Sequence, residues 1–280
     1  MQRISSLVEL GLWKGRLHGE TLGFVPTMGA LHEGHVSLVQ LSLDRGAKTL
    51  VSIYVNPTQF NNPEDLAKYP NTLEKDLEML ESIGCDAVFL PTAEMLYPEG
   101  LKSRAFSFGC LDLNMEGAGR PGHFEGMATV VTKFFELIQP DFAVFGEKDY
   151  QQLCIIRHVV AEENWPVEII PGPIVREVDG LAMSSRNLRL TPNEREQAAT
   201  IYAVLSKACN EVDGFTDVET LKNYCFETLN SEPSLAVEYI ECCDALKLQP
   251  VEKLDPNIPM RLFAAVRCGN VRLIDNLALF

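Results

Sequence analysis

An apolar run, a glycine turn and a periodic segment follow one another early in the chain. Residues 22–26 are apolar, Gly29 lies in the turn after them, and Leu38, Leu41 and Leu43 lie on one side of the periodic segment. This pattern predicts a strand, a tight turn and a helix. We expect backbone N–H groups of the turn, and the positive end of the helix, to face outward, where they would suit a phosphate.

Two histidines, His32 and His35, stand at the start of the predicted helix. Because they are three residues apart, they share one face of the helix, and each can donate a hydrogen bond to a phosphate oxygen. A zinc-protease motif does not fit, since His-Glu-x-x-His separates its histidines by four residues. A helix cap or a core contact is the alternative for either histidine alone, but the pair in this setting favours nucleotide binding.

The segments that follow predict a parallel sheet. A β-forming run at residues 49–55 completes a strand–helix–strand unit, which implies parallel strands. Ligands of such sheets bind beyond the carboxyl ends of the strands, so Gln59 should face the same crevice as the two histidines. The remaining strands of this part are predicted at residues 86–90, 142–145 and 167–171. Residues 1–19 should contain a helix, residues 64–83 should be helical with an interruption at Pro70, and residues 127–138 should form another helix.

The Gly- and Pro-rich stretch at residues 91–126 is predicted to be a binding loop or lid. Prolines 171 and 173 mark a change of pattern, and we place a domain boundary there. Residues 1–175 should form a Rossmann-like α/β domain, with a parallel sheet and helices on both faces. Residues 176–280 should form a smaller α+β domain, with helices at 192–212 and 218–229 and strands at 237–242 and 261–266.

Charge and composition limit the possible functions. The 280 residues carry a formal net charge of −15 and contain no basic block, which argues against non-specific nucleic-acid binding. We expect neither a secretory signal nor a membrane span, because no apolar run reaches the roughly 18 residues that a span needs. The eight cysteines form no Cys-x-x-Cys pair, so a reduced, cytoplasmic protein is predicted.

Six separated motifs resemble those of the pantoate–β-alanine ligase family, in the family's order. The first also resembles the His-x-Gly-His nucleotide-binding signature of the nucleotidyltransferase superfamily, which includes relatives of the class I aminoacyl-tRNA synthetases. The motifs lie at residues 26–35, 55–60, 120–124, 146–152, 183–187 and 272–276. This resemblance covers nearly the whole chain.

The resemblance implies an ATP-dependent condensation of pantoate with β-alanine to give pantothenate, AMP and pyrophosphate. The product is vitamin B5, upstream of coenzyme A. The pantoate carboxylate would attack the α-phosphorus of ATP, and the amine would then attack the enzyme-bound pantoyl adenylate. Because the first step brings two anions together, catalysis should come from positioning and from positive groups around the phosphates. ATP as co-substrate, Mg²⁺ with unassigned ligands, and a homodimer are also implied.

The resemblance also assigns roles to individual residues. His35 is the candidate acid toward the leaving phosphate, Lys148 should contact the phosphates and Asp149 the ribose. Catalytic roles fall to His32, His35, Lys148 and Arg186. ATP contacts fall to Met28, Gly29, Ala30, Leu31, His32, Glu33, Gly34, His35, Gly146, Glu147, Lys148, Asp149, Val175, Met183, Ser184, Ser185 and Arg186. Gln59 and Gln152 form the pantoate clamp, and Arg120 and His123 are expected to touch substrate or phosphate.

Several alternatives stay open. Lys148 and Asp149 could be a surface ion pair, and Ser184 and Ser185 could cap the next helix. Gln59 could be a turn residue that satisfies backbone groups. A different nucleotidyltransferase, which moves AMP onto a small phosphorylated substrate, and a nucleotide-sensing module without turnover are the competing functions. In the ligase interpretation, residues 176–280 act as a lid.

Overall fold

The computed structural model describes residues 1–280, and their packing divides the chain into two units. The main division falls between Pro173 and Ile174. Two short earlier segments, Gly109–Glu116 and Lys148–Gln151, pack with unit 2 and not with unit 1. Lys148 and Asp149, which the sequence placed in the first domain, therefore belong to unit 2 by their packing.

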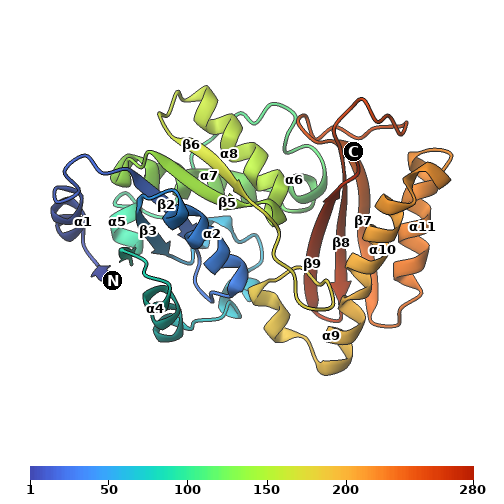
Figure 1. Cartoon of the computed structure of the whole chain (residues 1–280), viewed down its shortest axis with the longest axis horizontal. Helices are drawn as coiled ribbons and strands as arrows, with labels where there is room; N and C mark the ends of the chain where they lie inside the picture. Colours follow the sequence, from blue (N-terminus) through green and yellow to red (C-terminus); the bar gives the residue numbers. More distant parts are fainter. The chain divides into compact units, whose positions relative to one another are not determined.

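Unit 1 is built on a six-stranded parallel sheet with the order β1-β4-β3-β2-β5-β6 (Figure 1). The strands are β1 (Gln2–Ile4), β2 (Leu22–Thr27), β3 (Lys48–Ile53), β4 (Ala87–Phe89), β5 (Phe142–Gly146) and β6 (Glu168–Gly172). Val25, Val51 and Val88 pack against the helices of one face, while Phe24 and Phe89 contact the helices of the other. Strands covered on both faces are apolar throughout, which explains the apolar runs and confirms the Rossmann-like prediction.

The helices of unit 1 fill the connections between its strands. They are α1 (Leu7–Lys14), α2 (Glu33–Asp44), α3 (Pro63–Ala67), α4 (Leu73–Ser82), α5 (Ala93–Leu96) and α7 (His123–Ile138), with the 3₁₀ turn η1 (Pro57–Gln59). The 3₁₀ turn η2 (Glu147–Asp149) has residues in both units. The helices α6 (Met115–Gly119) and α8 (Tyr150–Glu162) each have residues in both units. The α2 and α4 helices pack on one face of the sheet, and α7 contributes Phe134 to the other.

The structure gives exact bounds to two of the helices predicted in unit 1. The helix predicted within residues 1–19 runs from Leu7 to Lys14, and the residues before it, Gln2–Ile4, form a parallel strand with β4. Leu10 and Trp13 of this helix are buried, whereas Leu7 is 42% exposed. The helical segment predicted at residues 64–83 is interrupted at Pro70, as expected. It consists of α3 before Pro70 and α4 after it, because proline lacks the N–H that a helix interior needs.

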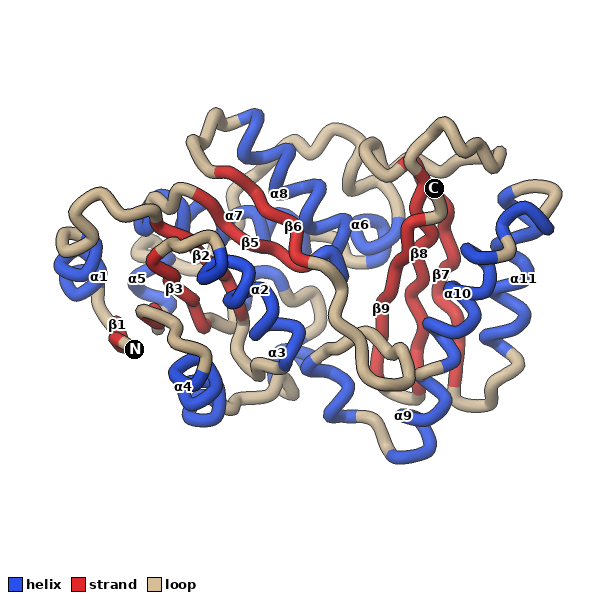
Figure 2. Tube along the Cα trace, viewed as in Figure 1, coloured by secondary structure: helices blue, strands red, loops and turns tan.

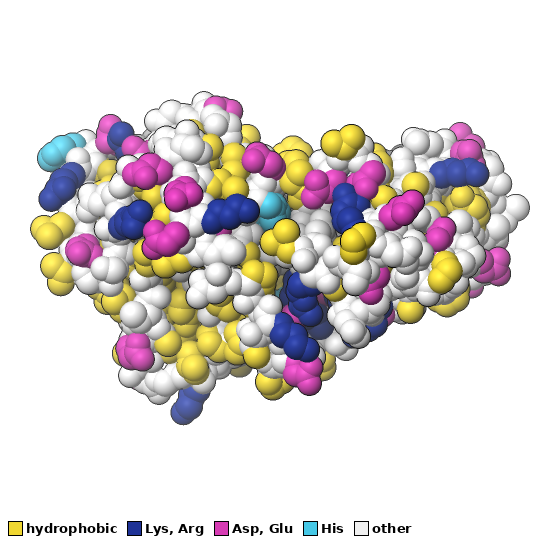
Figure 3. Space-filling view, turned by 90° about the horizontal axis from the view of Figure 1, so that it is seen from below, with side chains coloured by type: hydrophobic (Ala, Val, Ile, Leu, Met, Phe, Trp, Pro, Cys, Tyr) yellow, Lys and Arg dark blue, Asp and Glu magenta, His cyan; other side chains and the backbone are white.

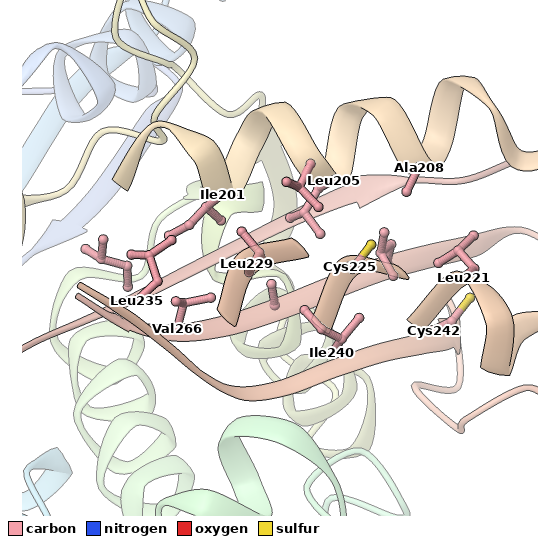
Figure 4. Packing of buried hydrophobic residues seen from close by; sticks show 14 of the residues in the cluster. Ile201, Leu205, Ala208, Leu221, Cys225, Leu229, Leu235, Ile240, Cys242 and Val266 are labelled. Carbon is pink, nitrogen blue, oxygen red and sulfur yellow. The ribbon is translucent and has the colours of Figure 1, made fainter. Parts of the chain in front are cut away.

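Unit 2 contains its own three-stranded antiparallel sheet, whose strands are drawn in red in Figure 2. Its strands are β7 (Leu235–Asp244), β8 (Met260–Cys268) and β9 (Val271–Ala278), and its helices are α9 (Pro192–Ala198), α10 (Thr200–Asn210) and α11 (Val218–Asn230), with 3₁₀ turns η3 (Ser185–Arg189) and η4 (Val212–Gly214). The strands β7 and β8 were predicted from the sequence, but β9 was not. Leu205 of α10 and Leu221 of α11 face Ile240 and Val266 of the sheet, and this packing forms the core of the unit (Figure 4).

The structure contains no helix with both the length and the apolarity that a membrane span requires. On the face shown in Figure 3, Lys and Arg side chains are interspersed with Asp and Glu side chains. All eight cysteines are free, and only Cys110 is exposed.

Candidate active site

The strand order of unit 1 marks where a ligand should bind. From β2 the chain continues to β3 on one side, whereas β5 pairs with β2 on the other side. In open α/β sheets, ligands bind beyond the carboxyl ends of the strands at such a switch point. The turn at Met28–Leu31 follows β2, and the turn at Gly146–Glu147 follows β5, so the two turns expected to bind ATP leave neighbouring strands.

The turn after β2 is held from inside the protein by a residue that the sequence analysis missed. The Asp76 carboxylate of α4 is 1% exposed and accepts the N–H groups of Ala30 at 2.8 Å and Leu31 at 2.9 Å. The N–H of Gly29 donates to the Thr27 hydroxyl at 3.3 Å. The expectation that N–H groups of this turn face outward toward a phosphate is therefore wrong for these three residues.

Gly29 occupies a position that only glycine fits well. Its φ is +78°, a left-handed conformation that other residues adopt with strain. A Cβ there would also lie 3.0 Å from the Asp76 carboxylate and from Ile53. The turn is thus shaped by its backbone and by the buried carboxylate beneath it.

His32 and His35 lie together at the start of α2, as predicted, with ring centroids 4.1 Å apart. The Nδ1 of His32 accepts the Gly34 N–H at 3.2 Å, and the Nδ1 of His35 accepts the His32 N–H at 3.4 Å. In each neutral ring the proton is therefore assigned to Nε2, because a nitrogen that accepts a hydrogen bond carries no proton. Each histidine both caps the helix and presents an Nε2–H donor, so the cap alternative and the ligand interpretation are compatible.

Gln59 lies next to Met28 of the turn after β2. Its Nε2 is 3.0 Å from the Met28 sulfur, and its Oε1 accepts the Asn56 amide at 3.1 Å. Asn56 is 1% exposed and accepts the Tyr97 hydroxyl at 2.8 Å. Burial raises the pKa of Tyr97, which keeps the phenol protonated as a donor. Asn56 was not among the predicted site residues, and its place within the motif at residues 55–60 was the sequence feature that could have identified it.

His123 and Arg120 support Gln59 from the other side. The Nδ1 of His123 is 2.8 Å from the Gln59 carbonyl oxygen, and its Nε2 is 3.1 Å from an Arg120 nitrogen. A carbonyl only accepts and a guanidinium only donates, so His123 carries its proton on Nδ1. It donates from Nδ1 to the Gln59 carbonyl and accepts at Nε2 from Arg120. His123 is 6% exposed and uses both ring nitrogens within the protein.

The adjacent glutamines Gln151 and Gln152 have different environments. Gln151 is 4% exposed; it accepts the Glu116 N–H at 2.9 Å and donates to the carbonyls of Leu111 at 2.7 Å and Asn114 at 2.9 Å. Gln152 is half-buried in the first turn of α8, and its side chain makes no hydrogen bond. The second member of the predicted clamp thus keeps its amide available for a ligand.

Lys148 and Asp149 form an ion pair within unit 2, with 3.7 Å between Nζ and the carboxylate. Asp149 is half exposed and Lys148 is 21% exposed, so this pair alone would contribute little stability. The Lys148 carbonyl accepts the Asn276 side-chain amide at 2.9 Å. The turn is therefore tied to β9, a partner that the sequence analysis did not foresee.

The last predicted segment follows a short hairpin in unit 2. The Met183 N–H donates to the Val175 carbonyl at 3.0 Å, and Arg176 pairs with Ala182 across the hairpin. Ser184 caps η3 by accepting the Arg186 N–H at 3.3 Å. The capping alternative therefore applies to Ser184, while Ser185 is buried.

The structure thus gathers the predicted residues in two groups, one within each unit. The group in unit 1 contains Met28–His35, Gln59, Arg120, His123, Gly146, Glu147 and Gln152, and the group in unit 2 contains Lys148, Asp149, Val175 and Met183–Arg186.

Comparisons with known proteins agree along the full chain. Residues 2–278 match the family model of pantoate-beta-alanine ligase. The pantothenate synthetase of Bacteroides thetaiotaomicron is 48% identical over 94% of this chain and 92% of its own length. The crystal structure of pantothenate synthetase from Thermus thermophilus superposes with a TM-score of 0.92 at 40% identity, covering both chains completely.

A second solved structure was determined with ligands. The pantoate-beta-alanine ligase from Francisella tularensis, complexed with Beta-gamma ATP and Beta-alanine, has a TM-score of 0.85 and 37% identity, over 100% of this chain and 98% of the other. Because the family model and these relatives span almost the whole sequence, the match is not limited to one motif or one unit. The chain belongs to the pantoate-beta-alanine ligase family.

Proposed function

We propose that this protein condenses pantoate with β-alanine at the expense of ATP, through a pantoyl adenylate, and releases AMP and pyrophosphate. The observation that carries the proposal is the family match over residues 2–278. The ligand-bound Francisella relative, similar over the full chain, supports ATP and β-alanine as substrates. Pantoate is the carboxylate that the family name supplies.

In the first step, His32 and His35 would stabilise charge on the phosphates of ATP. Their Nδ1 atoms accept backbone N–H groups, so each neutral ring offers Nε2–H as its donor. A fixed donor aimed at developing negative charge is a major source of catalysis, because it needs no reorganisation during the reaction. We therefore assign His35 first as a hydrogen-bond donor to the phosphates and second as an acid toward the leaving group.

Gln59 and Gln152 would hold pantoate. A neutral amide binds a carboxylate without the strong charge-assisted bond, worth roughly 1.5–3 kcal/mol, that an arginine would give to the anionic ground state. Binding the ground state less tightly favours reaction, since the carboxylate loses its charge as it attacks phosphorus. His123 and Arg120 support this function indirectly, because they fix the backbone of Gln59.

Unit 2 would supply the cations Lys148 and Arg186 to the phosphates, with Asp149 at the ribose and Val175 at the adenine edge. Residues 176–280 would act as a lid that closes when ATP binds. Closure would exclude water, which otherwise hydrolyses an acyl adenylate.

Magnesium fits this site only as a companion of ATP. The structure contains no group of three or more His, Cys, Asp or Glu side chains that could hold a metal ion. Mg²⁺ usually binds substrate phosphates and water with one or two carboxylates, so a protein-built cage is not needed. When bound, the ion would neutralise phosphate charge. The homodimer and the cytoplasmic location stay predictions, and sedimentation and cell fractionation test them.

Isotope exchange tests the proposed function. Purified protein should exchange labelled pyrophosphate into ATP when pantoate and Mg²⁺ are present and β-alanine is absent. Exchange that requires β-alanine would contradict the adenylate order. Transfer of AMP to a phosphorylated acceptor would support another nucleotidyltransferase activity, and ATP binding without exchange would support a sensing module.

A further inference from the structure

The strand β9 carries two adjacent buried polar residues, Asp275 and Asn276, which are 4% and 2% exposed. They belong to the 272–276 motif, to which the proposed function gives no role. Successive side chains of a strand point to opposite faces of the sheet, so the two residues contact different neighbours. Burial of polar groups is costly unless they are bonded, and each has partners from a segment expected to bind ATP.

Asn276 holds the turn that carries Lys148. Its Nδ2 donates to the Lys148 carbonyl at 2.9 Å, and its Oδ1 accepts a bond from Arg261. Because a guanidinium only donates, the Arg261 bond fixes which end of the amide faces the turn. The Arg261 guanidinium also lies 4.0 Å from the centroid of the Tyr150 ring, which begins α8. The turn is thus bound at its carbonyl and at the next aromatic residue.

Asp275 holds the hairpin that leads to Met183. Its two carboxylate oxygens accept both terminal nitrogens of Arg176, at 2.6 and 2.9 Å. Arg176 donates in addition to the Gly180 carbonyl at 3.1 Å and lies 4.1 Å over the Tyr202 ring. Such a bidentate bond fixes both distance and orientation. The residues that follow the hairpin therefore start from a fixed point on β9.

We infer that Asp275 and Asn276 are a positioning pair, which sets the spacing between the Lys148 turn and the Met183–Arg186 loop for ATP. Neither residue needs to touch the nucleotide. This inference rests on the proposed function, in which both segments contact ATP. A change at either residue should weaken ATP binding without changing how pantoate is bound in unit 1.

Two variants isolate the two bonds, and a third is the control. Asn276→Asp keeps the size and the Arg261 bond but replaces the donor that faces the Lys148 carbonyl with an oxygen. Asp275→Asn removes the charge that pairs with Arg176. Arg267 of β8 forms a partly exposed ion pair with Glu238 of β7, so Arg267→Gln breaks an ion pair that touches neither segment.

In pyrophosphate exchange, each of the first two variants should raise KM for ATP about tenfold, equivalent to about 1.4 kcal/mol, with KM for pantoate within about twofold. The control should match the wild type in both constants. A purely structural role would lower the melting temperature and the active fraction while leaving KM for ATP unchanged, so that result overturns the inference.

Hydrogen exchange of the ligand-free chain gives a second readout that needs no activity. Asn276→Asp should speed exchange at residues 148–151, and Asp275→Asn at residues 176–183. Asn276→Ser, which is too short to reach the carbonyl, replaces Asn276→Asp if the latter does not fold. If the wild type shows no pantoate-dependent exchange of pyrophosphate into ATP, the proposed function is wrong. Unchanged hydrogen exchange in the variants overturns the positioning role by itself.

Discussion

The buried Asp76 carboxylate should be the main support of the turn between β2 and α2. It accepts the N–H groups of Ala30 and Leu31 and also the Thr72 hydroxyl at 3.0 Å. Replacement by alanine would leave two buried N–H groups without this acceptor. Each unsatisfied buried group costs about 1–3 kcal/mol, so Asp76→Ala should lower the free energy of unfolding by about 2–6 kcal/mol.

Asp76→Asn should cost about half as much. The asparagine oxygen can accept one of the two N–H groups, but its NH₂ group faces the other, so one donor loses its partner, at about 1–3 kcal/mol. The exposed Glu78 of the same helix offers a matched control. Glu78→Gln makes the same chemical change in solvent and should alter stability by less than about 0.5 kcal/mol.

Urea unfolding followed by tryptophan fluorescence measures these differences. The two tryptophans of the chain, Trp13 and Trp165, both lie in unit 1, so their emission reports the unit that contains the turn. The urea concentration at the midpoint should be highest for the wild type, lower for Asp76→Asn and lowest for Asp76→Ala. The dependence of the unfolding free energy on urea concentration should be unchanged. Equal midpoints for the wild type and Asp76→Ala would refute the role of the carboxylate.

Three further predictions follow from single residues. A Cβ at Gly126 would overlap the Thr58 carbonyl oxygen, so Gly126→Ala should displace the neighbouring Gln59 backbone and raise KM for pantoate at least about tenfold; an unchanged KM in pyrophosphate exchange would contradict this. Arg186→Ala should slow adenylation by roughly 10- to 150-fold, and Arg186→Lys should recover only part of the rate. Near-normal turnover of Arg186→Ala in stopped-flow assays would show that the Met183–Arg186 loop only links the neighbouring segments. At pH 8 a thiol reagent should label the exposed Cys110 first, because burial raises the pKa of Cys85 to about 12 and keeps it a protonated thiol; rapid labelling of all eight cysteines in the folded chain would disagree.

The parallel sheet and its order of elements could be predicted because the signals are local. Fully buried strands are continuous apolar runs, and turns with glycine punctuate them. The strand β1 has three residues and is held by pairing with β4, from Gln2↔Ala87 to Ile4↔Phe89. No residue near it in the sequence indicates that pairing, so β1 was not predicted.

The strand β9 was missed for a related reason. Polar residues at Arg272, Asp275 and Asn276 break the apolar alternation that identifies a strand. Arg272 donates two bonds to Glu116, both of 2.7 Å, and the other two bond Arg176 and the Lys148 carbonyl. All of these partners are remote in the sequence. The polar pattern reflects tertiary contacts, not exposure to solvent.

The family, the parallel α/β fold and the pairing of His32 with His35 at the start of a helix could all be predicted from the sequence. These features depend on periodicity and on short motifs, which neighbouring residues define. Two features became visible only in the folded chain: Asp76 accepts the N–H groups of the turn after β2, and Lys148 packs with unit 2. The physical reason is that a buried polar group must find a partner wherever packing brings one, and packing joins segments that the sequence holds far apart.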